Sequence, residues 1–171
     1  MAEHGKQDAV ALLKADHRKV EGLFAEFEKA SGSSRKQKLA QQICVELKIH
    51  TILEEEIFYP ACEGKVDEDQ LEEAYVEHDA AKVLIGQIEE ATPDAAFYDA
   101  KVKVLSEEIE HHVEEEEKRM EGIFSQARKA GLDMDALGEQ MAARKAQLLA
   151  GYKADGQLTT QMSSMPEQPA P

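Results

Sequence analysis

The sequence predicts an all-α fold: an antiparallel up-and-down four-helix bundle followed by a short C-terminal fifth helix. The chain has 171 residues, 42% of them hydrophobic and 5% aromatic, which is enough for one helical domain with its own core. Apolar residues recur in steps of three and four, and Gly, Pro and Ser clusters separate these periodic stretches. We therefore expect a bundle over residues 8–130, a helix over 131–151 and a disordered tail over 152–171.

The first two helices are predicted over about residues 8–30 and 34–62, separated by the Ser31-Gly32-Ser33-Ser34 cluster. Asp8 is a suitable N-cap for the first of them. Each apolar face is interrupted by polar residues. His17 lies within the first face, and His50 and Glu54, one turn apart, lie within the second. The apolar members are Val10, Leu13, Val20, Phe24 and Phe27 in the first helix and Leu39, Ile43, Leu47 and Ile57 in the second.

The third helix is predicted from Asp67, a second capping residue, to about 91, with His78 on its apolar face. Thr92-Pro93-Asp94 closes it and opens a fourth helix that we expect to run to about 130, where Gly131 stops it. The fourth face contains His112 and Glu116 among Val102, Leu105, Ile109, Met120 and Ile123.

A fifth helix is expected from Asp133 to about 150. Its apolar stripe is thin, comprising Leu137, Met141 and Leu148. This stripe is predicted to pack either on its own bundle or on a second chain, so the sequence does not decide the oligomeric state.

Six polar residues on these apolar faces predict a metal site. A single histidine in such a face is more often a hydrogen-bonded core residue, and a Glu-rich run is usually solvated. Here each of the four helices supplies one histidine, and two glutamates follow a histidine by four residues. The registers of the first three histidines match within about a turn, and that of His112 matches if the third connection extends past Pro93 towards Ala96. A core of that composition needs a cation. The predicted ligands are His17, His50, Glu54, His78, His112 and Glu116.

The residue types of the six predicted ligands narrow the choice of metal. Imidazole with carboxylate suits iron, manganese or zinc, and two carboxylates among four imidazoles suggest two ions bridged by Glu54 and Glu116. Ferritin-like bundles use Glu-x-x-His on two helices. In this chain only Glu108 and His111 have that spacing, and both are expected to point outward.

At this point the chain resembles the hemerythrin-like HHE cation-binding domains. The resemblance rests on four motifs: Asp16-His17-Arg18, His50-x-x-x-Glu54-Glu55 followed by Phe58-Tyr59-Pro60, Glu77-His78, and His112-x-x-x-Glu116-Glu117. It implies a carboxylate-bridged pair of non-haem iron ions, with His17 and His50 on one iron and His78 and His112 on the other.

The chain also departs from that pattern. Oxygen-carrying hemerythrins have a further histidine one turn after the third-helix histidine, and Lys82 occupies that position here. This departure leaves one iron a ligand short and argues against reversible oxygen carriage. Tyr75, about one turn before His78, is a candidate to approach the vacated position. His111 remains an alternative to His112, because the last acid of those hemerythrins lies five residues from its histidine.

Three functions follow from this reasoning. The first is a di-iron binding protein that takes up oxygen, nitric oxide or iron in sensing, storage or a stress response. The second is a di-iron enzyme that turns over peroxide or nitric oxide, which Lys82 favours slightly. The third is a structural zinc site.

The net charge and the absence of a long apolar run limit the expected partners and location. A formal net charge of -15 argues against nucleic acid and anionic membranes as partners. The absence of a long apolar run argues against a membrane span or signal peptide and favours a cytoplasmic protein.

Overall fold

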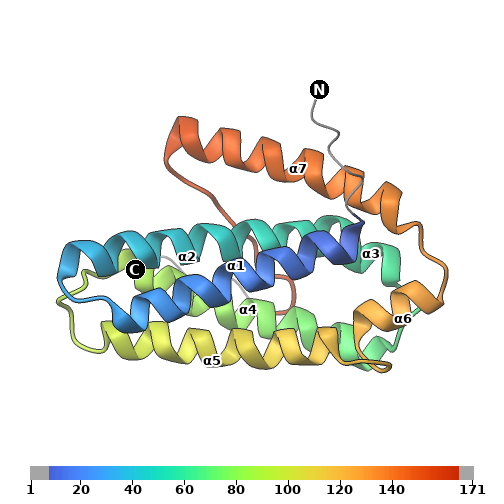
Figure 1. Ribbon diagram of the computed structural model, residues 1–171, viewed down its shortest axis with the longest axis horizontal. Coiled ribbons are helices and arrows are strands. Elements are labelled where there is room, and N and C mark those ends of the chain that lie inside the picture. Colours follow the sequence, from blue (N-terminus) through green and yellow to red (C-terminus); the bar gives the residue numbers. More distant parts are fainter. Residues whose placement is uncertain (1–7, 166–171) are drawn as a thin grey trace.

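The computed structural model describes residues 8–165, in which all regular structure is helical. Four long helices run antiparallel to their neighbours: α1 (Ala9–Lys29), α2 (Ser33–Leu53), α4 (Glu68–Glu90) and α5 (Tyr98–Glu117) (Figure 1). The chain of α2 continues through the π-helix η1 (Glu54–Phe58) into the short α3 (Tyr59–Cys62). The predicted fold class is confirmed.

The helix starts follow from local capping. The side chain of Asp8 accepts a hydrogen bond from the backbone N–H of Ala11 at the start of α1, and Asp67 does the same for Gln70 at the start of α4. Each carboxylate satisfies one of the backbone donors that a helix leaves unpaired. Between α4 and α5 the loop is longer than expected, because α5 starts at Tyr98 and not at Pro93.

The prediction of one unbroken helix to residue 130 is wrong. Helix α5 ends at Glu117, and a separate helix α6 (Ile123–Lys129) follows a tight turn. Gly122 allows this turn, because a Cβ there would lie 2.3 Å from the carbonyl oxygen of Glu116 and 2.7 Å from the backbone nitrogen of Lys118. Met120, expected in the core, is 68% exposed in the turn.

Helix α7 (Met134–Asp155) lies across α1 and α2 on the outside of the bundle (Figure 1). Met141 and Leu148, two residues of its predicted stripe, are buried against the same chain. The following segment also differs from the expected disordered tail. After α7 the chain turns at Gly156 and runs back over α2 and α4, where residues up to 165 form hydrogen bonds with the bundle. The tail residues 166–171 lie outside the described part.

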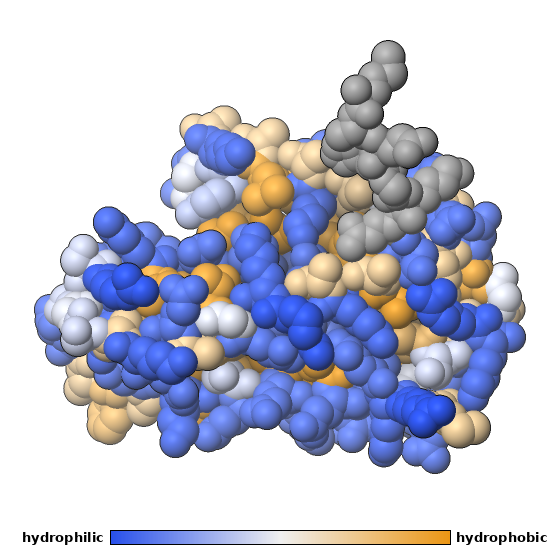
Figure 2. Space-filling view, viewed as in Figure 1, coloured by the Kyte–Doolittle hydropathy of each residue, from blue (hydrophilic) through white to orange (hydrophobic). Residues whose placement is uncertain are grey.

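Two apolar cores fill the bundle, one toward each end. The first surrounds Phe58, Tyr59 and Phe124 and includes the buried face of α7, whereas the second surrounds Phe24, Ile43 and Leu105. A layer of buried histidines and glutamates lies among them. The surface seen in Figure 2 is mostly hydrophilic, with smaller hydrophobic patches. Within residues 8–165, no helix combines the length and apolar character required to span a membrane.

Candidate metal centre

The structure brings all six predicted ligands into one buried layer. His17 comes from α1, His50 from α2, Glu54 from η1, His78 from α4, and His112 and Glu116 from α5. Glu54 is fully buried and Glu116 is 1% exposed. Among the described residues, their ligand atoms form two overlapping groups with metal-binding spacing, which share Glu54.

The histidines form two pairs. The Nε2 atoms of His17 and His50 lie 3.0 Å apart, and those of His78 and His112 lie 3.2 Å apart. Each pair joins helices that are neighbours in the bundle. All four Nε2 atoms therefore face the interior of the layer, in the arrangement that two imidazoles need to share one ion.

Each glutamate lies between the two pairs. Oε2 of Glu54 is 3.2 Å from Nε2 of His50 and 3.1 Å from Nε2 of His78. Oε2 of Glu116 is 3.4 Å from Nε2 of His17 and 3.5 Å from Nε2 of His112. Each of these carboxylates would therefore be within reach of a cation held by either histidine pair.

Buried polar atoms without a hydrogen-bond partner indicate whether the layer fits a cation. Oε1 of Glu54, Oε2 of Glu116 and Nδ1 of His50 are buried and have no hydrogen-bond partner. Each buried, unpaired polar atom costs about 1–3 kcal/mol. The two carboxylate oxygens could be satisfied by a metal ion, so the donor set fits a cation and the protein would gain stability from binding it.

A second set of carboxylates surrounds the histidines. Glu117 lies 2.7 Å from Nδ1 of His17, Glu55 lies 3.0 Å from Nδ1 of His78, and Glu77 lies 2.6 Å from Nδ1 of His112. A carboxylate only accepts hydrogen bonds, so each of these Nδ1 atoms carries the proton. In the neutral imidazole this leaves the lone pair on Nε2, where a metal would bind it.

His50, the fourth histidine, has its carboxylate neighbour at a longer distance. Asp16 Oδ2 is 3.8 Å from Nδ1 of His50, beyond hydrogen-bonding distance. Asp16 directly precedes His17, as Glu77 directly precedes His78, so each of these acidic neighbours supports the histidine of an adjacent helix.

Charges in the layer shift the protonation of its members. Burial lowers the pKa of His50, but the carboxylates of Glu54 and Asp16 outweigh it and raise that pKa to about 10. Burial also lowers the pKa of His78, while Glu54 and Glu55 raise it to about 9. Burial raises the pKa of Glu54, yet both histidines hold it well below its usual range. In the metal-free protein, His50 and His78 therefore carry protons that a metal must displace.

The π-helix adds a residue that sequence reasoning missed. In η1 the backbone N–H of Tyr59 bonds to the carbonyl of Glu54, five residues earlier. This wider turn brings residues five apart to the same side of the helix, and such turns often occur at functional sites. The hydroxyl of Tyr59 lies 2.7 Å from Glu116, 3.3 Å from Glu54 and 3.3 Å from Nε2 of His78.

Tyr59 is a hydrogen-bond donor in this setting. Burial and the neighbouring carboxylates of Glu116 and Glu54 raise the pKa of Tyr59 well above its usual value, so the phenol stays protonated and its O–H donates a hydrogen bond to Oε1 of Glu116. Tyr75, which we expected near the centre, packs its ring against that of Tyr59 with centroids 5.1 Å apart. No hydrogen bond between Tyr75 and the six predicted ligands is observed.

His111 and Lys82 both lie away from the histidine pairs. His111 is 61% exposed and lies near Glu77, so His112 is the histidine of α5 that faces the layer. Lys82 is buried, but its ammonium group binds Glu55 at 2.7 Å and Asp79 at 3.0 Å. Lys82 therefore contacts the surrounding carboxylates and not the histidine pairs.

Comparisons with known proteins place the fold and the family of the chain. A crystal structure of a hemerythrin HHE cation-binding domain-containing protein from Mycobacterium kansasii has a similar fold, with a TM-score of 0.72 and 22% identity over 88% of this chain and 94% of that one. A DNA nickase from Nostoc sp. strain PCC 7120 is 31% identical over 106 residues, which are 62% of this chain and 30% of the nickase. Residues 8–124 match the Hemerythrin HHE cation binding domain, and the chain belongs to that family.

Proposed function

We propose that this protein holds two non-haem iron ions bridged by Glu54 and Glu116, and that it binds oxygen or nitric oxide there in a sensing, storage or stress-response role. The observation that carries the proposal is the position of each glutamate between one histidine of either pair. In this assignment His17 and His50 hold one ion, and His78 and His112 hold the other.

The donor set favours iron over a structural zinc ion. Structural zinc sites are typically closed and tetrahedral, often rich in cysteine, and Cys44 and Cys62 are absent from this cluster. Two imidazoles with shared carboxylates leave coordination positions open, which is typical of iron centres that bind small molecules. Iron in such a site supplies redox chemistry and an open position for a diatomic ligand.

The engagement of Lys82 favours a second candidate, a di-iron enzyme that turns over peroxide or nitric oxide. Lys82 offers no ligand where oxygen-carrying hemerythrins have a histidine, so one ion has an additional free position. The hydroxyl of Tyr59 lies beside both glutamates and can donate a proton or a hydrogen bond there. A free position beside a proton donor suits turnover better than reversible binding.

The DNA-nicking activity in the name of the Nostoc relative is not part of this proposal. That relative is more than three times as long as the matched region, since the match covers 30% of it. A net charge of -15 also opposes the phosphate contacts that dominate DNA affinity.

Metal analysis and spectroscopy test the proposal. We expect about two irons per chain in protein purified in air, with absorption bands that bleach on anaerobic reduction and return with oxygen. Binding of nitric oxide to the reduced protein, against catalytic loss of peroxide or nitric oxide, separates the two roles. His112→Ala and Glu116→Ala should lose iron, while the exposed neighbours His111→Ala and Glu115→Ala should keep it. Zinc in the native protein, or iron retained by the first two variants, would refute the di-iron assignment.

A further inference from the structure

The C-terminal segment, residues 131–165, lies beyond the family match and packs back onto the bundle. Helix α7 crosses α1 and α2, and Gly156 then takes a left-handed conformation (φ 67°) that reverses the chain. From there the chain runs over α2 and α4 (Figure 1). The segment therefore reaches the outside of three of the four helices that supply the histidines.

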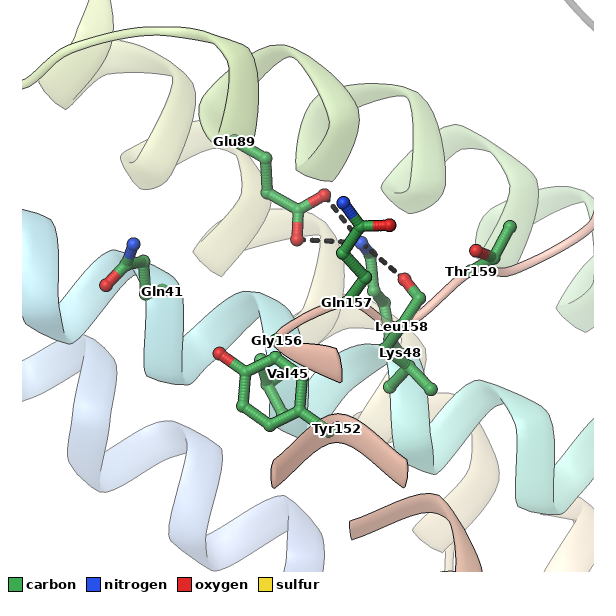
Figure 3. A pocket seen from close by; sticks show the side chains of 9 residues that line it. All are labelled: Gln41, Val45, Lys48, Glu89, Tyr152, Gly156, Gln157, Leu158 and Thr159. Carbon is green, nitrogen blue, oxygen red and sulfur yellow. Dashed lines mark hydrogen bonds and ion pairs between the residues drawn. The ribbon is translucent and has the colours of Figure 1, made fainter. Parts of the chain in front are cut away.

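A basic residue of α2 holds the start of the returning chain. Nζ of Lys48 binds the carbonyl oxygen of Leu158 at 2.9 Å and the carboxylate of Glu89 on α4 at 2.5 and 2.7 Å. These residues line a pocket of about 430 Å³ together with Tyr152 of α7 and Gly156 (Figure 3). The pocket shares no lining residue with the metal layer. It shows how the returning chain is anchored before it reaches α4.

Further along, the segment contacts a carboxylate of the metal layer. Oγ of Ser163 donates to Oε2 of Glu55 at 2.9 Å, and Glu55 in turn binds Nδ1 of His78. Lys82 joins this contact to the segment, because its Nζ binds Glu55 at 2.7 and 2.9 Å and the carbonyl oxygen of Gln161 at 2.7 Å.

A buried aspartate fixes Ser163 in place. The carboxylate of Asp79 accepts the backbone N–H groups of Ser163, Ser164 and Met165 and the hydroxyl of Ser164. Three consecutive backbone donors on one carboxylate define the path of the chain, so the hydroxyl of Ser163 has little freedom to leave Glu55.

Helix α7 makes a related but looser contact on the other side of the layer. Nζ of Lys145 binds Oδ1 of Asp16, and the second oxygen of Asp16 faces Nδ1 of His50 at 3.8 Å. Asp16 is buried, so the ammonium group of Lys145 is a close counter-charge for it. The next residue back, Arg144, binds Glu56 on the surface.

The contacts of Ser163 and Lys145 both reach a histidine that lies beside Glu54. His50 and His78 are the two histidines beside Glu54. The histidines beside Glu116 have other support, since His17 faces Glu117, which binds Arg18, and His112 faces Glu77. Among the contacts of the described residues, the C-terminal segment thus supports one half of the layer.

We propose that Lys145 and Ser163 are positioning residues that tune the Glu54 side of the metal pair, acting through Asp16 and Glu55 on His50 and His78. A carboxylate beside Nδ1 makes an imidazole a stronger ligand and fixes its orientation. A cation or hydroxyl on that carboxylate holds it in place against the imidazole. The inference rests on the proposed function, because it needs an ion held by these histidines.

The experiment compares two matched pairs of variants in the full chain. Ser163→Ala removes the hydroxyl on Glu55, and Ser164→Ala removes a neighbouring hydroxyl on Asp79. Lys145→Met removes the charge on Asp16, and Arg144→Met removes a neighbouring charge on Glu56. Conservative variants, Ser163→Thr and Lys145→Arg, keep the interacting group.

The readouts are iron dissociation constant, midpoint potential and absorption spectrum, with thermal unfolding of the metal-free protein as a check on folding. Losing a direct outer partner of a ligand costs roughly 10–100-fold in metal affinity. Ser163 and Lys145 act one contact further out, so we expect Ser163→Ala and Lys145→Met to weaken iron binding by about tenfold, the lower end of that range, and to shift potential and spectrum. Ser164→Ala keeps the three backbone contacts to Asp79, so it should change these values less than Ser163→Ala does. Arg144→Met and the conservative variants should match the native protein.

Equal effects of Ser163→Ala and Ser164→Ala, and of Lys145→Met and Arg144→Met, would overturn the inference while leaving the di-iron proposal standing. A native protein without bound iron would refute the proposed function, and this inference with it. The two failures are therefore distinguishable in the first sample measured.

Discussion

Glu116→Gln gives the sharpest test of the metal layer, because Glu116 lies beside one histidine of each pair. The substitution keeps the size of the side chain and a carbonyl that can accept from Tyr59, but removes the charge that two cations would share. Both metal positions should weaken together. The matched control is Glu115→Gln, one residue earlier on α5 and exposed.

The expected magnitude follows from binding linkage. Free metal at 100 times its dissociation constant adds about 2.7 kcal/mol per site to the free energy of unfolding, so about 5 kcal/mol for two sites. For a chain of this size that raises the melting temperature by about 10–20 °C. If Glu116→Gln weakens each site about 100-fold, the same metal concentration adds less than about 1 kcal/mol, or roughly 2–4 °C.

Differential scanning calorimetry with chelator and then with ferrous iron under anaerobic conditions measures this increment for each protein. Comparing increments within each variant removes any effect of the substitution on the metal-free fold. The native protein and Glu115→Gln should show the large increment. A large increment in Glu116→Gln would refute the bridging role, even if its metal-free melting temperature had changed.

Three further predictions concern other parts of the site. Tyr59→Phe should keep the metal but change the absorption spectrum and slow the reaction with peroxide, because it removes only the hydroxyl beside Glu116. Gly122→Ala should cost about 1–3 kcal/mol and reduce bound metal, because its Cβ would collide with the backbone at the end of α5. Metal added near pH 7.5 should release about two protons per chain, since the pKa values of His50 and His78, about 10 and 9, keep both protonated without metal.

Each of these predictions has a control variant or an outcome that would contradict it. Tyr75→Phe should leave the spectrum unchanged, and Gly151→Ala, with open space around it, should stabilise α7 by roughly 0.5–1 kcal/mol. Folding raises the pKa values of His50 and His78 above the ordinary histidine value of 6.5, so the stability they add is complete below pH 6.5 and disappears through pH 9 to 10. A dye assay that detects no proton release, or a metal-free protein whose stability is flat across that range, would contradict the assignment.

The inward positions of the six polar residues were predictable because helical periodicity is a strong signal. His78 and His112 share faces with buried apolar neighbours such as Ile85 and Ile109, and a helix has only one face toward the core. The internal spacing of His50 and Glu54 placed both on that face. Helical periodicity did not predict side-chain positions where the backbone departs from the α-helix.

Tyr59 shows why the rest was missed. Five residues separate it from Glu54, and an α-helix would direct the two side chains to different sides. Only the wider turn of η1 aligns them, and nothing in the composition of Glu54–Phe58 marks a π-helix. The turn before α6 escaped for a similar reason: Gly122 was a signal, but a glycine inside a periodic stretch is usually tolerated.

The C-terminal segment was missed because its interactions are polar and long-range. Its composition, rich in Gln, Ser and Thr, offers little apolar area, which is the usual criterion for order. Order here comes instead from the buried carboxylate of Asp79 and the ammonium group of Lys82, both on α4. Neither residue belongs to an apolar pattern, so their partners could be identified only from the fold.

These outer contacts also explain how a bundle can tolerate so polar a layer. In the metal-free protein, protons on His50 and His78 balance negative charge on the glutamates of the layer. Two divalent ions would replace those protons and leave the layer more positive. The surrounding carboxylates, including Glu55 and Glu77, then supply the compensating negative charge. Lys82 fits this arrangement, since its charge holds Glu55 against His78 and its ammonium group is bound by carboxylates outside the histidine pairs.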